Sequence, residues 1–257
     1  MKMIPQIKIE NLTKTFKTSA GKITALKDIS LEIGEGECLI IGGENGSGKS
    51  VLMSIIAGLE TCDSGSVKIE GDVGQGAGRG LGRRRSPVGL VFQEAETQIL
   101  GETPAEDIAF GPKNLGWKKE QVELAVKNAL EKTGLTEKAC FPARFLSGGE
   151  KRRLAVACML AMDLPVIILD EPYANLDYCG VKQVNALVRQ LKQDGKTVII
   201  LTHEIEKCLG LANRFVVLYK GTKVFEGTPE EGLAQNLEAW NIKNPIVSYK
   251  GVEDLVW

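Results

Sequence analysis

Residues 43–50 form the pattern of a loop that binds phosphate groups. They read Gly-Glu-Asn-Gly-Ser-Gly-Lys-Ser, which matches G-x-x-x-x-G-K-[ST] at every fixed position. The glycines let backbone N–H groups surround a phosphate, the lysine can reach the β- and γ-phosphates, and the last serine can hold Mg²⁺. The residues predicted to bind a nucleotide are therefore Gly43, Glu44, Asn45, Gly46, Ser47, Gly48, Lys49 and Ser50.

Two carboxylates, Asp170 and Glu171, directly follow the apolar run 166–169. Strands of a parallel sheet end at the ligand crevice, so both side chains are predicted to lie there. Asp170 suits coordination of Mg²⁺, and Glu171 suits a general base toward an attacking water. Such a pair is by itself often a solvated turn. The phosphate loop in the same chain favours the catalytic interpretation.

Three further residues stand at the ends of predicted strands. His203, the only histidine of the chain, follows the run 198–202 and is predicted to contact the γ-phosphate or the water. Gln93 follows 88–92, and its neutral amide can bind Mg²⁺ or the water. Phe16 ends the first strand, where its ring could stack on an adenine or serve only for packing.

A second glycine-rich segment, residues 146–150, reads Leu-Ser-Gly-Gly-Glu and precedes a predicted helix. A helix N-terminus with glycines attracts phosphate groups, because backbone N–H groups and partial positive charge gather there. One nucleotide does not need two such loops from one chain. Ser147, Gly148 and Gly149 are therefore predicted to cap a nucleotide held by a second subunit.

These residues require a sheet whose strand ends meet. Short apolar runs at 38–41, 88–92, 166–169, 197–201 and 215–218 predict buried strands, and helices are expected at 49–59 and 180–193. This order predicts an α/β core with parallel strands and crossover helices. Strands are also expected at 7–16, 23–33 and 67–69, and a helix capped by Thr228 with Pro229 at its first position.

The region 97–162 is poor in strand signals and predicts a helical subdomain. Apolar positions recur there with a period of 3.6 residues, at Val122, Ala125, Val126, Ala129, Leu130 and Thr133. The glycine- and arginine-rich stretch 71–85 is expected to be a flexible, solvated loop.

The bulk composition of the 257 residues excludes some classes of function. The 32 basic and 33 acidic residues give a net charge of -1, which offers no support for nucleic-acid binding. Six cysteines without a CxxC pair indicate reduced, mostly buried residues of a cytoplasmic protein. Neither a signal peptide nor a membrane span is predicted, because apolar runs are far shorter than the roughly twenty residues that a span needs.

With these elements in order, the chain resembles the ATP-binding cassette (ABC) ATPases. The resemblance rests on the Walker A loop (43–50), the Q-loop (Gln93), the signature (146–150), Walker B (166–171), the D-loop (175–177) and the switch histidine (His203). It implies a P-loop core with an N-terminal antiparallel β subdomain and an inserted helical subdomain. The implied units are a nucleotide-binding domain at 4–238, with the helical subdomain at about 97–162, and a C-terminal extension at 239–257.

The resemblance also implies how two copies share nucleotides. Two cassettes would bind head to tail, with Mg²⁺ and ATP between the Walker A loop of one and the signature of the other. Lys49, Ser50, Gln93, Asp170, Glu171 and His203 would then act on the chain's own nucleotide. Ser147, Gly148 and Gly149 would act on the opposite one, and Asp177 would link the two sites.

A narrower resemblance connects segments 92–98, 107–116 and 146–157 with the ATPases of energy-coupling factor (ECF) importers. Such complexes import vitamins or transition-metal ions. They pair two ATPases with a transmembrane coupling subunit and a substrate-binding membrane subunit, at the cytoplasmic face of the membrane. The alternatives are another ABC importer or an exporter, and a non-transport cassette acting in DNA repair or translation.

Three departures from the ABC pattern bear on the site. Val51 stands where a hydroxyl residue is common, Glu150 replaces the commoner glutamine, and Tyr173 leads a segment that usually holds small residues. The expected results are slightly weaker nucleotide binding, altered interface electrostatics and an altered D-loop geometry.

Overall fold

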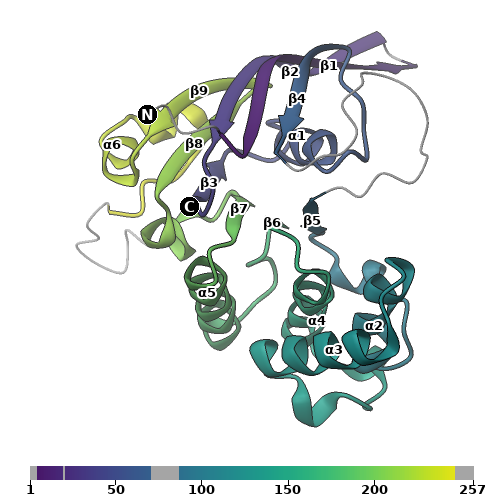
Figure 1. Cartoon of the computed structure of the whole chain (residues 1–257). Coiled ribbons are helices and arrows are strands. Elements are labelled where there is room, and N and C mark those ends of the chain that lie inside the picture. Colours follow the sequence, from purple (N-terminus) through teal and green to yellow (C-terminus); the bar gives the residue numbers. More distant parts are fainter. Residues whose placement is uncertain (1–4, 20, 71–86, 247–257) are drawn as a thin grey trace.

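The computed structural model of the chain describes residues 5–19, 21–70 and 87–246 (Figure 1). The stretch 71–85, expected to be a solvated loop, lies outside the described residues, as do residues 247–257 of the predicted C-terminal extension. The strands are β1 (Ile7–Thr18), β2 (Gly21–Ile33), β3 (Cys38–Gly42), β4 (Ser64–Ile69), β5 (Val88–Val91), β6 (Val166–Asp170), β7 (Thr197–Thr202), β8 (Arg214–Tyr219) and β9 (Thr222–Gly227). The α-helices are α1 (Lys49–Ile56), α2 (Pro104–Asn114), α3 (Lys119–Thr133), α4 (Gly148–Ala161), α5 (Tyr178–Gln193) and α6 (Pro229–Leu233). Single 3₁₀ turns are η1 (Ala95–Gln98), η2 (Thr136–Lys138), η3 (Ala143–Phe145), η4 (Ile205–Lys207), η5 (Leu209–Leu211) and η6 (Leu237–Trp240).

A six-stranded sheet with the order β5-β6-β7-β3-β8-β9 forms the centre of the fold. Its first five strands run parallel, and β9 runs antiparallel to β8. Every residue of β3, β5 and β7 is buried, because elements cover both faces of the sheet. The predicted α/β class is confirmed. The edge strand β9 was not predicted, because its side chains are mostly half-buried and give no apolar run.

The two faces of this sheet belong to two different cores. Along β3, Leu39 and Ile41 point to the core under α1 and the N-terminal strands, whereas Cys38 and Ile40 point to the core under α4 and α5. This alternation follows from the two-residue period of a strand. Each buried strand therefore contributes to both cores, which fixes the sheet between its two covering layers.

The N-terminal strands form a separate antiparallel sheet with the order β2-β1-β4. Ile7, Ile9 and Leu12 of β1 are buried, and they pack into the same core as α1. The predicted antiparallel N-terminal sheet is thus confirmed, and Figure 1 shows it lying over α1.

Helices α2, α3 and α4 form a block with its own core (Figure 1). The predicted apolar face of α3 is confirmed, since Val122, Ala129, Leu130 and Thr133 are buried. Helix α4 belongs to two cores, because Leu154 faces the helical block while Ala155 and Val156 face the central sheet. The predicted limits of the helical subdomain, 97–162, stay a proposal.

The last described helix, α6, begins as predicted. Thr228 is its N-cap and accepts a hydrogen bond from the Glu231 N–H group, and Pro229 occupies the first turn. The predicted helix at 49–59 is shorter than expected, because α1 ends at Ile56 and a turn with Gly58 at positive φ follows.

The six cysteines are free thiols, as predicted. The expectation that most are buried is wrong, because only Cys38 and Cys208 are buried, whereas Cys140 and Cys179 are exposed. Among the described residues, no helix combines the length and apolar character needed to cross a membrane.

Candidate functional site

Four neighbouring parallel strands bring most of the predicted site residues to one edge of the central sheet. Gln93 follows β5, Asp170 ends β6 and Glu171 follows it, His203 follows β7, and the loop 43–50 follows β3. Because carboxyl ends of parallel strands meet at the same edge, these side chains converge there.

The loop 43–50 has the backbone conformation that its glycines allow. Gly43, Gly46 and Gly48 have φ angles of 154°, 82° and 103°. A Cβ atom on Gly43 would lie 2.3 Å from the Leu218 carbonyl oxygen, and one on Gly48 would lie 2.6 Å from the Ala25 carbonyl oxygen. The loop is therefore fitted tightly against β8 and β2, and only glycine is tolerated at these two positions.

Lys49 holds the loop from inside. Its side chain is 5% exposed, and its ammonium group donates hydrogen bonds to the carbonyl oxygens of Gly43 (2.7 Å) and Glu44 (3.1 Å). The same Nζ atom lies 3.6 Å from Glu171 Oε1. Burial lowers the pKa of Lys49, and the nearby carboxylates of Glu171 and Asp170 oppose that shift.

Glu171 is the buried centre of the site, with an exposed fraction of 6%. It has a positive φ of 45°, and its N–H group donates to the Leu201 carbonyl oxygen of β7 at 2.9 Å. Its Oε2 atom lies 3.0 Å from His203 Nδ1 and accepts a hydrogen bond from the His203 backbone N–H group at 3.3 Å. One carboxylate thus contacts both the loop lysine and the single histidine. Its residue has a left-handed backbone conformation that residues other than glycine rarely adopt.

Two buried oxygens near the loop have no hydrogen-bond partner among the described residues, namely Ser47 Oγ and Asp170 Oδ1. Burial raises the pKa of Asp170, and a hydrogen bond from Ser50 opposes that shift. A buried polar atom without a partner is costly unless a ligand satisfies it. The Ser50 hydroxyl and the Asp170 carboxylate are hard oxygen donors of the kind that Mg²⁺ prefers.

Gln93 is exposed, and its backbone is anchored by a hydrogen bond. Its carbonyl oxygen accepts a bond from Arg152 Nη2 at 3.1 Å.

Phe16 lies on β1, opposite Ile23 of β2. It is 36% exposed, and Lys14 Nζ lies 5.0 Å from the centre of its ring. Because Gly48 packs against Ala25, two residues along β2 from Ile23, the ring lies on the hairpin that borders the phosphate loop.

The segment 147–149 lies apart from the phosphate loop, at the start of α4 in the helical block. Ser147 is the N-cap, and its hydroxyl accepts a bond from the Glu150 N–H group at 3.3 Å. Gly148 is exposed and would leave space around an added Cβ atom. Within the described chain, hydrogen bonds do not connect this segment with residues 43–50.

Glu150 has a local role that the sequence did not reveal. Its carboxylate accepts a bond from the Ser147 N–H group at 2.8 Å, which completes a capping box, and it pairs with Lys138 at 2.6 Å. The pattern S-x-x-E before an apolar run is a known capping signal and could have identified this role.

Residues in and next to the D-loop segment form hydrogen bonds that fix its local conformation. Tyr173 is fully buried, and its hydroxyl donates to Asn185 Oδ1 at 2.7 Å. Asp177 is the N-cap of α5 and accepts a bond from the Gly180 N–H group at 2.7 Å. Asn175 turns the chain with a positive φ of 58°. The predicted alteration of the D-loop geometry stays a prediction.

A second contact that the sequence did not reveal reaches the phosphate loop from the C-terminal segment. Asn241, which follows η6, donates a hydrogen bond to the Glu44 carboxylate at 2.7 Å. The two residues are 197 positions apart, so no local pattern could have indicated this bond.

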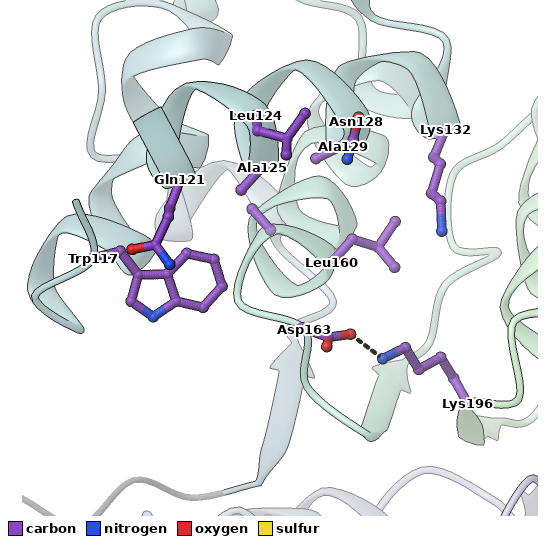
Figure 2. Close-up of a pocket in the computed structure, with 11 residues that line it drawn as sticks. Trp117, Gln121, Leu124, Ala125, Asn128, Ala129, Lys132, Leu160, Asp163 and Lys196 are labelled. Atoms are coloured by element: carbon purple, nitrogen blue, oxygen red, sulfur yellow. Dashed lines mark hydrogen bonds and ion pairs between the residues drawn. The ribbon is translucent and has the colours of Figure 1, made fainter. Parts of the chain in front are cut away.

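A surface pocket lies between α3, the end of α4 and the residues that precede β6 and β7 (Figure 2). Trp117, Leu124 and Leu160 line it, and an ion pair between Asp163 and Lys196 (2.6 Å) borders it. Asp163 and Lys196 precede β6 and β7, whereas the predicted site residues follow these strands. None of the predicted site residues lines this pocket.

Comparison with known proteins gives a consistent result. The family model described as ABC transporter matches residues 26–174. An "energy-coupling factor transporter ATP-binding protein EcfA2" of Methanospirillum hungatei is 39% identical over 95% of this chain, which spans 61% of that relative. The corresponding EcfA of Methanocaldococcus jannaschii is 39% identical over 87% of the chain and 81% of the relative. EcfA2 of Thermotoga maritima is 42% identical over 81% of the chain and 77% of the relative.

Solved structures agree in fold. The structure of cbiO1 from Clostridium perfringens, described as part of the ABC transporter complex cbiONQ, has a TM-score of 0.78 and 32% identity, and it covers 90% of this chain and 91% of its own. The ATP-binding cassette MJ0796, solved as a dimer in a post-hydrolysis state with ADP and Pi, has a TM-score of 0.72 and 28% identity, over 87% and 98% of the two chains.

Proposed function

Because the chain belongs to the ABC transporter family, we propose that it is the ATP-hydrolysing subunit of an energy-coupling factor importer. Its relatives from several organisms carry the name energy-coupling factor transporter ATP-binding protein, which supports this subgroup. The cargo would be a vitamin or a transition-metal ion. The similarity to cbiO1, part of a transporter complex, supports the same assignment.

The observation that carries the enzymatic proposal is the position of Glu171 between Lys49 and His203. Its carboxylate is buried, 3.6 Å from the ammonium group and 3.0 Å from the imidazole Nδ1 atom. A buried carboxylate fixed on two sides suits a general base that takes a proton from a water attacking the γ-phosphate. Lys49 would stabilise charge on the transferred phosphoryl group, and His203 would orient the base and contact the γ-phosphate.

The nucleotide would lie on the loop 43–50, whose N–H groups surround its phosphates. We propose that Ser50, Asp170 and Gln93 hold Mg²⁺, which neutralises phosphate charge when bound. The unpaired Asp170 Oδ1 atom supports this proposal. Phe16 is proposed to stack on the adenine ring, since its partly exposed ring lies on the hairpin beside the loop.

The proposed complex contains two ATPases. Ser147, Gly148 and Gly149 would contact the nucleotide of the partner ATPase, and the exposure of Ser147 and Gly148 supports contact with a second chain. The other partners would be a transmembrane coupling subunit and a substrate-binding membrane subunit. The chain would therefore work at the cytoplasmic face of the membrane.

The proposed base is tested by Glu171→Gln. The amide keeps the shape of the side chain but cannot accept the proton, so kcat for ATP should fall by about 10²–10⁴-fold. Binding of ATP should persist, because the phosphate loop is unchanged. Steady-state ATPase assays and equilibrium binding of ATP measure the two effects separately.

The matched control is Glu226→Gln. Glu226 also forms ion pairs, with Arg214 and Lys223, but it lies on the edge strand β9. This control should hydrolyse ATP like the wild type. Turnover of Glu171→Gln at the rate of the control would overturn the assignment of the base.

The importer subgroup is tested by purification of the chain from its native membrane. Recovery with a coupling subunit and a small substrate-binding membrane protein is expected. Recovery with the membrane subunits of an exporter, or dependence of transport on a periplasmic binding protein, would contradict the energy-coupling factor assignment and leave the ATPase proposal intact.

A further inference from the structure

Arg152, on the second turn of α4, is a buried cation that bonds only to backbone carbonyls. Its side chain is buried, with an exposed residue fraction of 8%. Nη2 donates to the Gln93 carbonyl oxygen at 3.1 Å, and Nη1 donates to the Ala174 carbonyl oxygen at 3.3 Å. Within the described chain, Arg152 forms no ion pair, and its buried Nε atom has no hydrogen-bond partner. Burial lowers the pKa of the guanidinium.

The two carbonyls belong to segments that are distant in sequence and close to the proposed catalytic residues. Gln93 follows β5, 59 positions before Arg152, and Ala174 lies 22 positions after it, between Glu171 and Asp177. The helix that carries Arg152 begins at Gly148, with Ser147 as its N-cap. One planar group therefore connects the start of α4 with two segments at the strand ends.

Burying such a cation costs folding free energy. A buried charge without an opposite charge loses its hydration and gains only partial compensation from neutral acceptors. The net gain in stability from such a contact is therefore small. The fork of the guanidinium offers something different, because it fixes two acceptors in one geometry.

Arg153 provides an internal comparison. It is the same residue type on the same helix, and its Nη1 donates to one carbonyl, that of Thr133 in α3, at 3.2 Å. That bond stays inside the helical block. Arg152 alone of this pair bridges from the block to the segments at the strand ends.

We propose that Arg152 is a positioning residue that couples the signature end of α4 to this chain's own Gln93 and to the turn after Glu171. The inference rests on the proposed function, in which the start of α4 contacts the nucleotide of the partner ATPase. A shift of α4 on that contact moves the two carbonyls with it. Occupancy of the partner's nucleotide site is thereby transmitted to the geometry of the chain's own site.

The test compares Arg152→Met with Arg153→Met in the full-length protein, with Mg²⁺ and ATP. Loss of a coupling contact should lower kcat of Arg152→Met by about 2- to 30-fold, the range seen for residues that transmit coupling. KM for ATP should stay unchanged, because the phosphate loop is not touched. The thermal midpoint should change little, because removing a buried charge stabilises the fold while leaving the two carbonyl acceptors unpaired destabilises it. Arg153→Met should keep the wild-type kcat.

Combination with Gln93→Ala separates coupling from a general structural effect. Arg152 acts partly through Gln93 and partly through Ala174, so the double variant should have a kcat below that of Gln93→Ala, but the two reductions should not multiply fully, as independent effects would. Should Arg152→Met fail to fold, Arg152→Lys carries the test, because its single ammonium keeps the charge without the fork and should lower kcat. Wild-type kcat in a folded Arg152 variant, or multiplying effects, would overturn the inference. An inactive wild-type protein would instead refute the proposed function.

Discussion

Asp170 and Lys49 are charged side chains that the fold buries at the site. For both groups burial is the main influence on the pKa, which it raises for Asp170 and lowers for Lys49. In each case burial disfavours the charged form. The charges that suit these residues to phosphate and metal binding therefore reduce the stability of the folded chain, as is common where function and stability compete.

Asp170→Asn should show this conflict directly. The pKa of Asp170 is raised above its ordinary 3.8 in the folded state, so the folded chain binds the proton more tightly than the unfolded chain. Stability is therefore lost as pH rises from about 4 through the folded pKa. The variant cannot ionise, so it should unfold at a higher temperature than the wild type at pH 7, with a difference that vanishes below about pH 4.

Calorimetry without nucleotide, paired with an ATPase assay, checks this expectation. The variant should gain thermal stability and lose Mg²⁺-dependent hydrolysis. Asp163→Asn is the control, because this carboxylate is 80% exposed and its surface ion pair with Lys196 contributes little. A lower or equal unfolding temperature of Asp170→Asn at pH 7 would contradict the burial argument.

Val51 illustrates how a departure at a single position is accommodated. It packs, partly buried, against the core that α1 shares with the N-terminal sheet. Its predicted effect, slightly weaker nucleotide binding, stays a prediction.

At the scale of elements, α4 depends on its first turn. Ser147 and Glu150 satisfy each other's backbone N–H groups there, and Lys138 pairs with the Glu150 carboxylate. The proposed contact with the second nucleotide site and the start of the helix thus involve the same residues. Glu150 supports the backbone of this segment through these contacts.

Glu150→Ala should destabilise the chain by about 1 kcal/mol, the usual cost of losing a cap contact. Glu150→Gln keeps an acceptor for the Ser147 N–H group and loses only a surface ion pair, so it should cost less than about 1 kcal/mol. Urea unfolding followed by circular dichroism measures both. Equal losses for the two variants would show that the ion pair with Lys138, rather than the capping box, supports the turn.

The elements that the sequence predicted well are those with a local signal. Buried strands such as β3 and β7 are continuous apolar runs, and the phosphate loop is specified by three glycines with positive φ. An element without such a signal was missed. β9 is half-buried and gives no apolar run, whereas α4 was predicted although it contributes to two cores.

The candidate site divides in the same way. Motif residues and their strand ends could be predicted, because each motif is contiguous. The contacts of Glu171 with Lys49 and His203 follow only from the strand order, in which β7 lies between β6 and β3. The bonds from Arg152 to Gln93 and from Asn241 to Glu44 connect distant segments, and a single sequence gives no indication of them.

At the scale of the whole molecule, the proposed nucleotide site needs parts from two chains. The loop 43–50 and the segment 147–149 lie on different bodies, the central sheet and the helical block. A head-to-tail pair of chains would place the loop 43–50 of one chain and the segment 147–149 of the other at each nucleotide. Such a pair is closed and symmetric.

Glu171→Gln should therefore form a dimer with ATP, because nucleotide that is bound and not hydrolysed keeps both interfaces closed. Size-exclusion chromatography with and without ATP measures the change. Adding Ser147→Arg should abolish the dimer, since a large side chain would occupy the contact, while ATP still binds the separate chain. A dimer that persists in the double variant would contradict the proposed role of residues 147–149.

The position of β3 in the middle of the sheet has a consequence for the synthesis of the protein on the ribosome. Gly42 pairs with Thr202, 160 residues later, and β8 follows later still. At about 5–20 residues per second, a ribosome needs about 8–32 s to produce that interval. Throughout this time an apolar strand has left the ribosome without either neighbour, so the nascent chain needs protection from aggregation. A message that ends before codon 197 yields a chain with the phosphate loop and neither strand that flanks β3.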